Sequence, residues 1–188
     1  MQAELTSALD RHDAVTDRWL DEIRGLTPAQ VNWRSAPETW SIAQCLEHVT
    51  TVSAQVLPAL AAASAGARAR GLTSQGPFRY GPLARWFLAG QSPSPARRMR
   101  TPAAYRPSDS ELEIDALEER FLEVQDGLRT TIVAADGLDL GRVRVPSPAL
   151  RLLRLPLGIW LQALPAHTDR HLEQARRVRA DGRFPMSR

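Results

Sequence analysis

Apolar residues recur every three or four positions over four long stretches of this 188-residue chain, and this spacing constrains the fold more than any other feature. It places the apolar side chains on one face of an α-helix. The pattern predicts helices over about residues 2–26, 42–63, 108–134 and 157–180. A weak strand-like pattern occurs over residues 142–145. We therefore expect an all-α protein built as a four-helix bundle.

Polar and glycine residues indicate where the helices begin and end. Ser41 is followed three positions later by Gln44, which is the spacing of a capping box at the start of the second helix. Ser108 or Ser110 is expected to cap the third helix. Gly25 and Pro28 are expected to end the first helix, and Gly137 and Gly141 to stop the third.

Glycine and proline are concentrated in residues 66–107, which predicts a long, irregular connection between helices two and three. Within it, residues 81–90 have the pattern of a short helix. Too little chain remains on either side for two separate cores, so we expect a single domain over residues 1–188. Pro58 is expected to bend or shorten the second helix, and Pro165 to interrupt the fourth.

All 24 basic residues are arginine, and they exceed the 21 acidic residues by only three charges. The absence of lysine excludes Schiff-base chemistry and a lysine general base. The small net charge, the 6% aromatic content and the lack of a known motif argue against nucleic-acid binding, despite a pI of 9.9. Residues 60–107 contain eight arginines and no acid. They form either a surface that faces acidic residues or solvent, or the border of a pocket for a small anionic substrate.

The single cysteine, Cys45, excludes an internal disulfide and a cysteine-based zinc finger, and is expected to be a small buried residue. The first thirteen residues do not resemble a signal peptide. The apolar stretch Leu155–Leu164 is much shorter than the roughly 20 residues of a membrane span. We expect a soluble, cytoplasmic protein without membrane contact.

Three histidines are candidate metal ligands. His167 and His171 are four positions apart on a predicted helix, so both imidazoles project from one face. Asp169, between them, points to the opposite side and is poorly placed as a base. His48 on the second helix could complete a three-nitrogen site inside the bundle. The alternative is that these are core histidines with ordinary hydrogen bonds.

Two segments carry a family resemblance: WSIAQCLEH, from Trp40 to His48, and HTDRHLEQ, from His167 to Gln174. Together with the order of the predicted helices, they resemble the DinB-like four-helix metalloproteins, which include the YfiT-type proteins. The resemblance implies that His48, His167 and His171 bind a divalent metal, zinc or nickel. It also implies a homodimer.

Three functions fit such a site. A metal held by three neutral imidazoles can bind a low-molecular-weight thiol as thiolate, for a transferase or isomerase reaction. It can instead bind hydroxide and act as a hydrolase of YfiT type. The third possibility is a metal-binding or small-ligand-binding protein without turnover. The lack of an obvious carboxylate base beside the ligands favours the thiol-dependent reaction on a small-molecule substrate.

Four further residues are candidates for the surroundings of the metal. Gln44 and Gln174 have the helix spacing to orient ligand imidazoles through their outer nitrogens. His12 lies on the apolar stripe of the first helix and either borders the metal pocket or is a core residue. Arg170 lies between the ligand turns, where it would meet either a substrate carboxylate or solvent.

Overall fold

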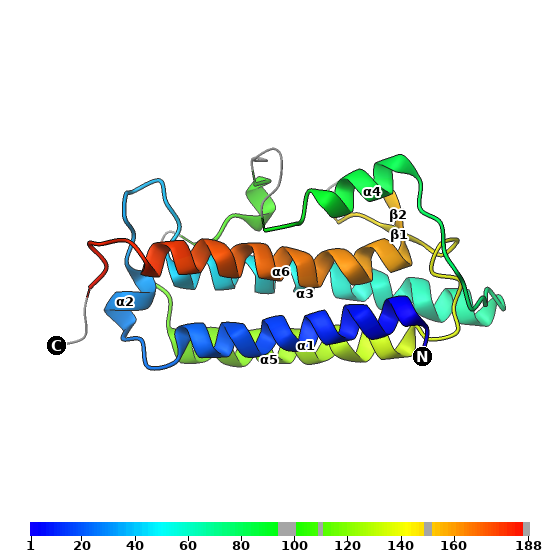
Figure 1. Cartoon of the computed structure of the whole chain (residues 1–188), viewed down its shortest axis with the longest axis horizontal. Helices are drawn as coiled ribbons and strands as arrows, with labels where there is room; N and C mark the ends of the chain where they lie inside the picture. Colours follow the sequence, from blue (N-terminus) through cyan, green and yellow to red (C-terminus); the bar gives the residue numbers. More distant parts are fainter. Residues whose placement is uncertain (94–100, 109–110, 149–151, 186–188) are drawn as a thin grey trace.

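The computed structural model describes residues 1–93, 101–108, 111–148 and 152–185. Four long helices form its bundle: α1 (Ala3–Ile23), α3 (Ile42–Ala69), α5 (Ile114–Ala134) and α6 (Leu157–Arg179) (Figure 1). The remaining elements are short: α2 (Pro28–Asn32), α4 (Pro82–Ala89), the 3₁₀ turn η1 (Ala103–Tyr105), β1 (Arg144–Pro146) and β2 (Arg154–Pro156). The prediction of an all-α fold is confirmed.

Helix α1 packs against α5 and α6, and α3 packs against the same two helices. Ion pairs show that α1 and α6 run in the same direction. Arg18 pairs with Asp169, and Glu22, one turn later, pairs with Arg176, about two turns further along α6. Helices α1 and α6 are therefore parallel neighbours, as their colours in Figure 1 also show.

Helices α3 and α5 are parallel neighbours as well. Leu57 lies against Gly127, and the Arg68 guanidinium donates to the Ala134 carbonyl further along both helices. Because a helix of 28 residues is about 42 Å long, the chain must travel back along the bundle before α5 can begin. The predicted long connection makes this return, and its helix α4 lies over α6 (Figure 1).

The core at the α2 end of the bundle is built around Trp19 and Phe121, both fully buried, with ring centroids 6.3 Å apart. The Trp19 indole N–H donates to the backbone carbonyl of Thr168 at 3.1 Å. That bond fixes α1 against the part of α6 that carries the two paired histidines. Leu46 and Leu172 pack into the same cluster from α3 and α6. The apolar packing thus holds α1, α3, α5 and α6 in register around the histidines.

Both internal prolines are accommodated within helices. Helix α3 continues past Pro58 to Ala69, six residues beyond the predicted end, and α6 is continuous through Pro165. The prediction that Pro165 interrupts the fourth helix was wrong, and of the two alternatives for Pro58, bending or shortening its helix, the shortening was wrong. Each proline removes one backbone N–H, and both helices lie along other bundle helices whose packing favours the unbroken form.

The start of the third long helix also differs from the prediction. Helix α5 begins at Ile114 with Glu113 at its N-cap, and the Glu113 side chain makes no capping hydrogen bond. Ser108 is not the N-cap, because Glu113 occupies that position; the Ser108 backbone N–H instead donates to Glu47 and its carbonyl accepts from Gln44, both on α3. Ser110, the other predicted cap, lies outside the described residues.

Smaller differences concern short elements. The predicted turn after α1 contains α2, which starts with a capping box between Thr27 and Gln30 and has Pro28 at its first position. The weak strand pattern corresponds to β1, which pairs antiparallel with β2. The short helix predicted over 81–90 is α4.

Among the described helices, only α3 is long and apolar enough to cross a membrane by length and composition. Core helices of bundles meet the same criterion, and α3 packs against both α5 and α6. The apolar stretch singled out from the sequence, Leu155–Leu164, belongs instead to β2 and the start of α6.

Candidate metal centre

Three histidines from two antiparallel helices meet between α3 and α6. His48 lies near the start of α3, and its ring centroid is 5.1 Å from that of His167 and 4.6 Å from that of His171. The two rings on α6, one turn apart, are also 4.6 Å from each other. One ligand nitrogen from each of the three lies within 4.8 Å of the others, so the cluster could hold a metal ion.

Hydrogen bonds orient two of the rings. The His48 Nδ1–H donates to the backbone carbonyl of Tyr105 at 2.6 Å, because a carbonyl oxygen can only accept. The His171 Nδ1 lies 3.0 Å from the Gln174 Oε1, which likewise accepts. Both rings are thereby left with the Nε2 lone pair free for a ligand bond.

The third ring approaches the same point. The His167 Nε2 is 3.3 Å from the His48 Nε2, so two potential ligand atoms face each other. The His167 Nδ1 is buried and has no hydrogen-bond partner among the described residues. A cation between the Nε2 atoms would satisfy lone pairs that otherwise face one another.

Burial keeps these imidazoles neutral. The His48 and His171 side chains are 4% and 7% exposed, and His167 is partly exposed. Desolvation is the largest cause that lowers the pKa of all three, and it lowers the pKa of His171 to about 3. The positive charge of Arg170 acts in the same direction. Neutral imidazole is the form that binds a metal.

Trp40 covers the cluster on one side. Its ring centroid is 4.9 Å from that of His48 and 5.7 Å from that of His171, and it stacks on the latter at an interplanar angle of 26°. The indole therefore packs against two candidate ligands and restricts the movement of their rings.

The long connection is tied down beside the cluster. Gln44 donates to the Ser108 carbonyl at 2.7 Å, and the Ser108 N–H donates to Glu47 at 2.7 Å. These contacts hold the segment after η1 against α3. They keep the Tyr105 carbonyl within reach of His48.

Gln44 does not orient an imidazole, so that prediction was wrong. Its Oε1 accepts from the backbone N–H of Ser41, as the capping box requires, and its Nε2 donates to Ser108. Gln174 lies where the helix spacing places it, with its Oε1 on His171.

His12 and Arg170 lie outside the cluster. His12 is 2% exposed and lines a hollow between α1 and α5 together with Gln125 and Arg129, and it is not one of the three clustered histidines. The Arg170 guanidinium donates to the carbonyl of Gly90 at the end of α4, at 2.7 Å. It thus joins α6 to the connection that covers it.

No carboxylate belongs to the cluster within the described part of the chain. Asp169 and Glu173 both pair with Arg18 on α1, at 2.7 and 2.8 Å, which places them on the side of α6 away from α3. Glu47 is engaged with Ser108. Cys45 is fully buried in the apolar core, where desolvation raises the pKa of its thiol, so it remains a protonated packing residue.

Sequence reasoning missed three contributors to this site: the Tyr105 carbonyl, the Trp40 ring as a cover, and Glu47 as an anchor. A backbone carbonyl carries no sequence signal. Trp40 begins one of the two segments that carry the family resemblance, but the Trp40 ring was given no role at the site. Glu47 precedes His48 directly, and the polar character of this helix position was the available signal.

Comparison with known proteins identifies the family to which this sequence is similar. The sequence profile described as the DinB superfamily matches residues 8–175. A search of curated proteins and a search of solved structures found no match. The matched range contains all three clustered histidines and the whole connection between α3 and α5.

Proposed function

This chain belongs to the DinB superfamily, and from that premise we propose that it is a divalent-metal-dependent enzyme acting with a low-molecular-weight thiol. The reaction is a transfer or an isomerisation of a small molecule. Zinc or nickel is the metal we expect. The observation that carries the proposal is the convergence of three neutral imidazoles, two of them oriented through Nδ1.

The donor set fits a divalent ion. Three nitrogen ligands from side chains on two packed helices match the sites that hold catalytic zinc with an open position. The ring contacts to the Tyr105 carbonyl and to Gln174 are the kind of outer hydrogen bond that metal-binding histidines make. An ion bound there would acidify a thiol or a water molecule that reaches its open position.

The protein's own residues prepare the site. The Tyr105 carbonyl holds the proton of His48 on Nδ1, and Gln174 does the same for His171. Trp40 shields two rings from water. Arg170 adds positive charge next to the cluster, which favours an anionic group there.

The positions of the nearby carboxylates favour the thiol-dependent reaction over hydrolysis. Hydrolysis by an activated water commonly uses a nearby acid–base residue. Asp169 and Glu173 are paired with Arg18, and the described residues offer no carboxylate at the cluster. A thiol acidified by the metal needs no such base. The hydrolase and the non-catalytic binding protein are the alternatives that experiments must separate.

Metal analysis tests the site. We would purify the wild type and the variants His48→Ala, His167→Ala, His171→Ala and His12→Ala, and measure tightly bound zinc and nickel. The first three variants should lose the metal. His12→Ala is the matched control, because His12 is equally buried but lies outside the cluster. Full metal content in all three cluster variants would refute the site.

Activity assays test the reaction class. The metal-loaded protein should consume a common cellular thiol together with an electrophile, and His171→Ala should abolish this turnover. Hydrolysis of amide or ester substrates without any thiol dependence would establish the hydrolase instead. A protein that binds metal but turns over neither class would be a binding protein.

A further inference from the structure

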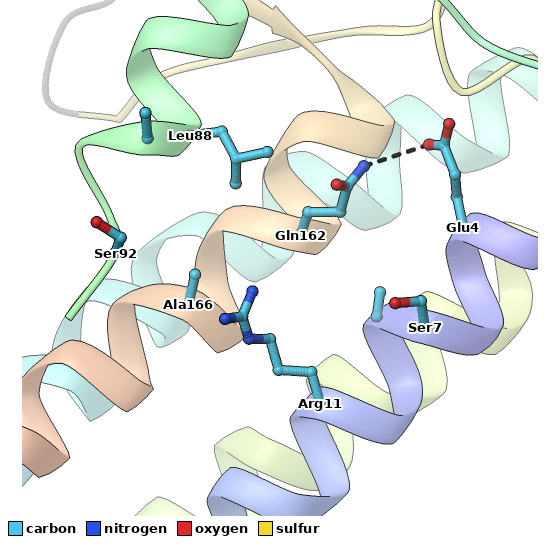
Figure 2. A pocket seen from close by; sticks show the side chains of 9 residues that line it. Glu4, Ser7, Arg11, Leu88, Ser92, Gln162 and Ala166 are labelled. Carbon is cyan, nitrogen blue, oxygen red and sulfur yellow. Dashed lines mark hydrogen bonds between the residues drawn. The ribbon is translucent and has the colours of Figure 1, made fainter. Parts of the chain in front are cut away.

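A second hollow lies across α1, α4 and α6, on the other side of α6 from the histidine cluster. It has a volume of about 330 Å³, which is within the range of small-molecule sites. Figure 2 shows side chains of α1 facing Gln162 and Ala166 on α6, with Leu88 and Ser92 closing the side formed by α4. No clustered histidine lines it.

Both ends of the hollow are polar, and the two ends carry opposite charges. Glu4 and Arg11 both project from α1 and both line the hollow. Arg11 lies seven positions after Glu4, which corresponds to about 10 Å along the helix axis. The hydroxyl of Ser7 lies between them, and Leu88 and Ala166 supply apolar wall. An elongated ligand with an apolar middle matches this arrangement.

Glu4 is held in place but keeps capacity for a cation. Its Oε2 accepts from the Tyr80 hydroxyl at 2.6 Å and from the Gln162 amide at 3.2 Å. Both donors are neutral, and no cation pairs with Glu4 among the residues described. The position of Tyr80 depends on Gly158, because a side chain there would collide with the tyrosine hydroxyl. The carboxylate is therefore fixed by contacts that leave its charge unneutralised.

Arg11 supplies the opposite charge. It is exposed, and within the described ranges it makes no hydrogen bond or ion pair. In Figure 2 its guanidinium extends from α1 toward Ala166. The neighbouring arginines behave differently: Arg18 is engaged by Asp169, and Arg24 by Asp21.

We propose that this hollow binds a small elongated zwitterion, with its cationic end at Glu4 and its anionic end at Arg11. The middle of the ligand lies over Ser7 and Ala166. Binding needs neither the metal nor any residue of the histidine cluster, so it goes beyond the function proposed above and can be tested independently of it. The ridge of α6 that carries Arg170, tied to Gly90, separates the two sites.

Chemical-shift titration of the ¹⁵N-labelled full chain provides the test. The probes are 6-aminohexanoate, hexanoate and hexylamine, which share a carbon chain and differ in charged ends. We expect 6-aminohexanoate to bind most tightly and to shift the amide signals of Ser7 and Ala166. Each charged contact at such a partly exposed site is worth up to about fivefold in affinity. Added salt should weaken the binding.

Single substitutions assign the two ends. Arg11→Gln should reduce the affinity for 6-aminohexanoate to that for hexylamine and leave hexylamine binding unchanged. Glu4→Gln should reduce it to that for hexanoate. Arg24→Gln and Asp10→Asn are matched controls, because they make the same charge changes outside the hollow, at the C-cap of α1 and on α1 itself.

Several results would overturn the proposal. One is the absence of saturable 6-aminohexanoate binding to the wild type. Another is an equal loss of affinity in Arg11→Gln and Arg24→Gln, which would indicate a general charge effect. Among the described residues Arg11 makes no hydrogen bond or ion pair that its substitution would remove, so its variant decides the question even if Glu4→Gln destabilises the protein through Tyr80.

Discussion

Acid should destabilise the metal-free protein through its buried imidazoles, and His171 allows the size of the effect to be worked out. The pKa of His171 in the folded protein is lowered to about 3, first by burial and then by the charges of His48 and Arg170. In the unfolded chain its pKa returns to about 6.5. Below that value the unfolded state binds more protons than the folded state, so the stability falls as the pH decreases.

The expected loss is about 2 kcal/mol for this residue when the pH falls from about 7.5 to about 5, since the unfolded imidazole is then almost fully protonated and the folded one is neutral. The perturbation is the substitution His171→Gln, which removes the titrating group. The substitution also removes the His171 charge, which is one of the causes that lower the pKa of His167. The difference between wild type and variant should therefore be at least this large.

Urea denaturation followed by circular dichroism, with a chelator present, measures the free energy of unfolding at each pH. Wild type and His171→Gln share every carboxylate, so the acid titration of those groups cancels in the comparison. The wild type should lose stability more steeply between about pH 6.5 and pH 5. Parallel pH profiles for the two proteins would refute the view that His171 is buried and neutral in the fold.

Three other substitutions or treatments test separate parts of the structure. Gln174→Leu should weaken zinc affinity by about 10- to 100-fold in a chelator competition, and Gln174→Glu, which keeps an acceptor, should not; equal affinities would contradict an orienting role. Gly158→Ala should cost about 1–3 kcal/mol in urea denaturation because the new methyl group displaces Tyr80, whereas Gly182→Ala, in open space, should cost little; equal costs would argue against the contact. Cys45 should react with a thiol reagent only after unfolding, and rapid reaction of the native protein would contradict its burial.

Helix periodicity predicted the long helices because each has one face buried in the bundle. The sequence-based helix boundaries were wrong where tertiary contacts outweigh the local conformational preference of a residue. Pro58 and Pro165 weaken a helix locally, yet both lie inside long helices supported by their neighbours. Ser108 has the chemistry of a cap, but its backbone is taken up by α3, and this contact between distant residues has no local signature.

The histidine cluster could be predicted from the sequence because its side chains have a distinctive spacing. His167 and His171 are one turn apart, His48 was a third candidate from its place on the second helix, and the family resemblance implied that the three act together. Of the two groups that orient the imidazoles, only one could be predicted from the sequence. Gln174 follows from the spacing on α6, whereas the Tyr105 carbonyl depends on where the chain returns over the bundle. The arginine-rich connection was considered for an anionic ligand, yet the arginine that lines the second hollow is Arg11 of α1, which has no ion-pair partner in the described part of the chain.

The direction of the helices explains why the connection belongs to the site. Because α3 and α5 are parallel, the chain between them must run back along the bundle, and this return brings η1 beside α3 and α4 over α6. It thereby places the Tyr105 carbonyl on His48 and the Gly90 carbonyl on Arg170. Four helices joined by short loops could hold three histidines, but they would lack the acceptor that keeps the proton of His48 on Nδ1. The long connection is therefore part of the candidate metal centre, and if the proposed metal site is correct, shortening the connection should impair metal binding even with all three histidines in place.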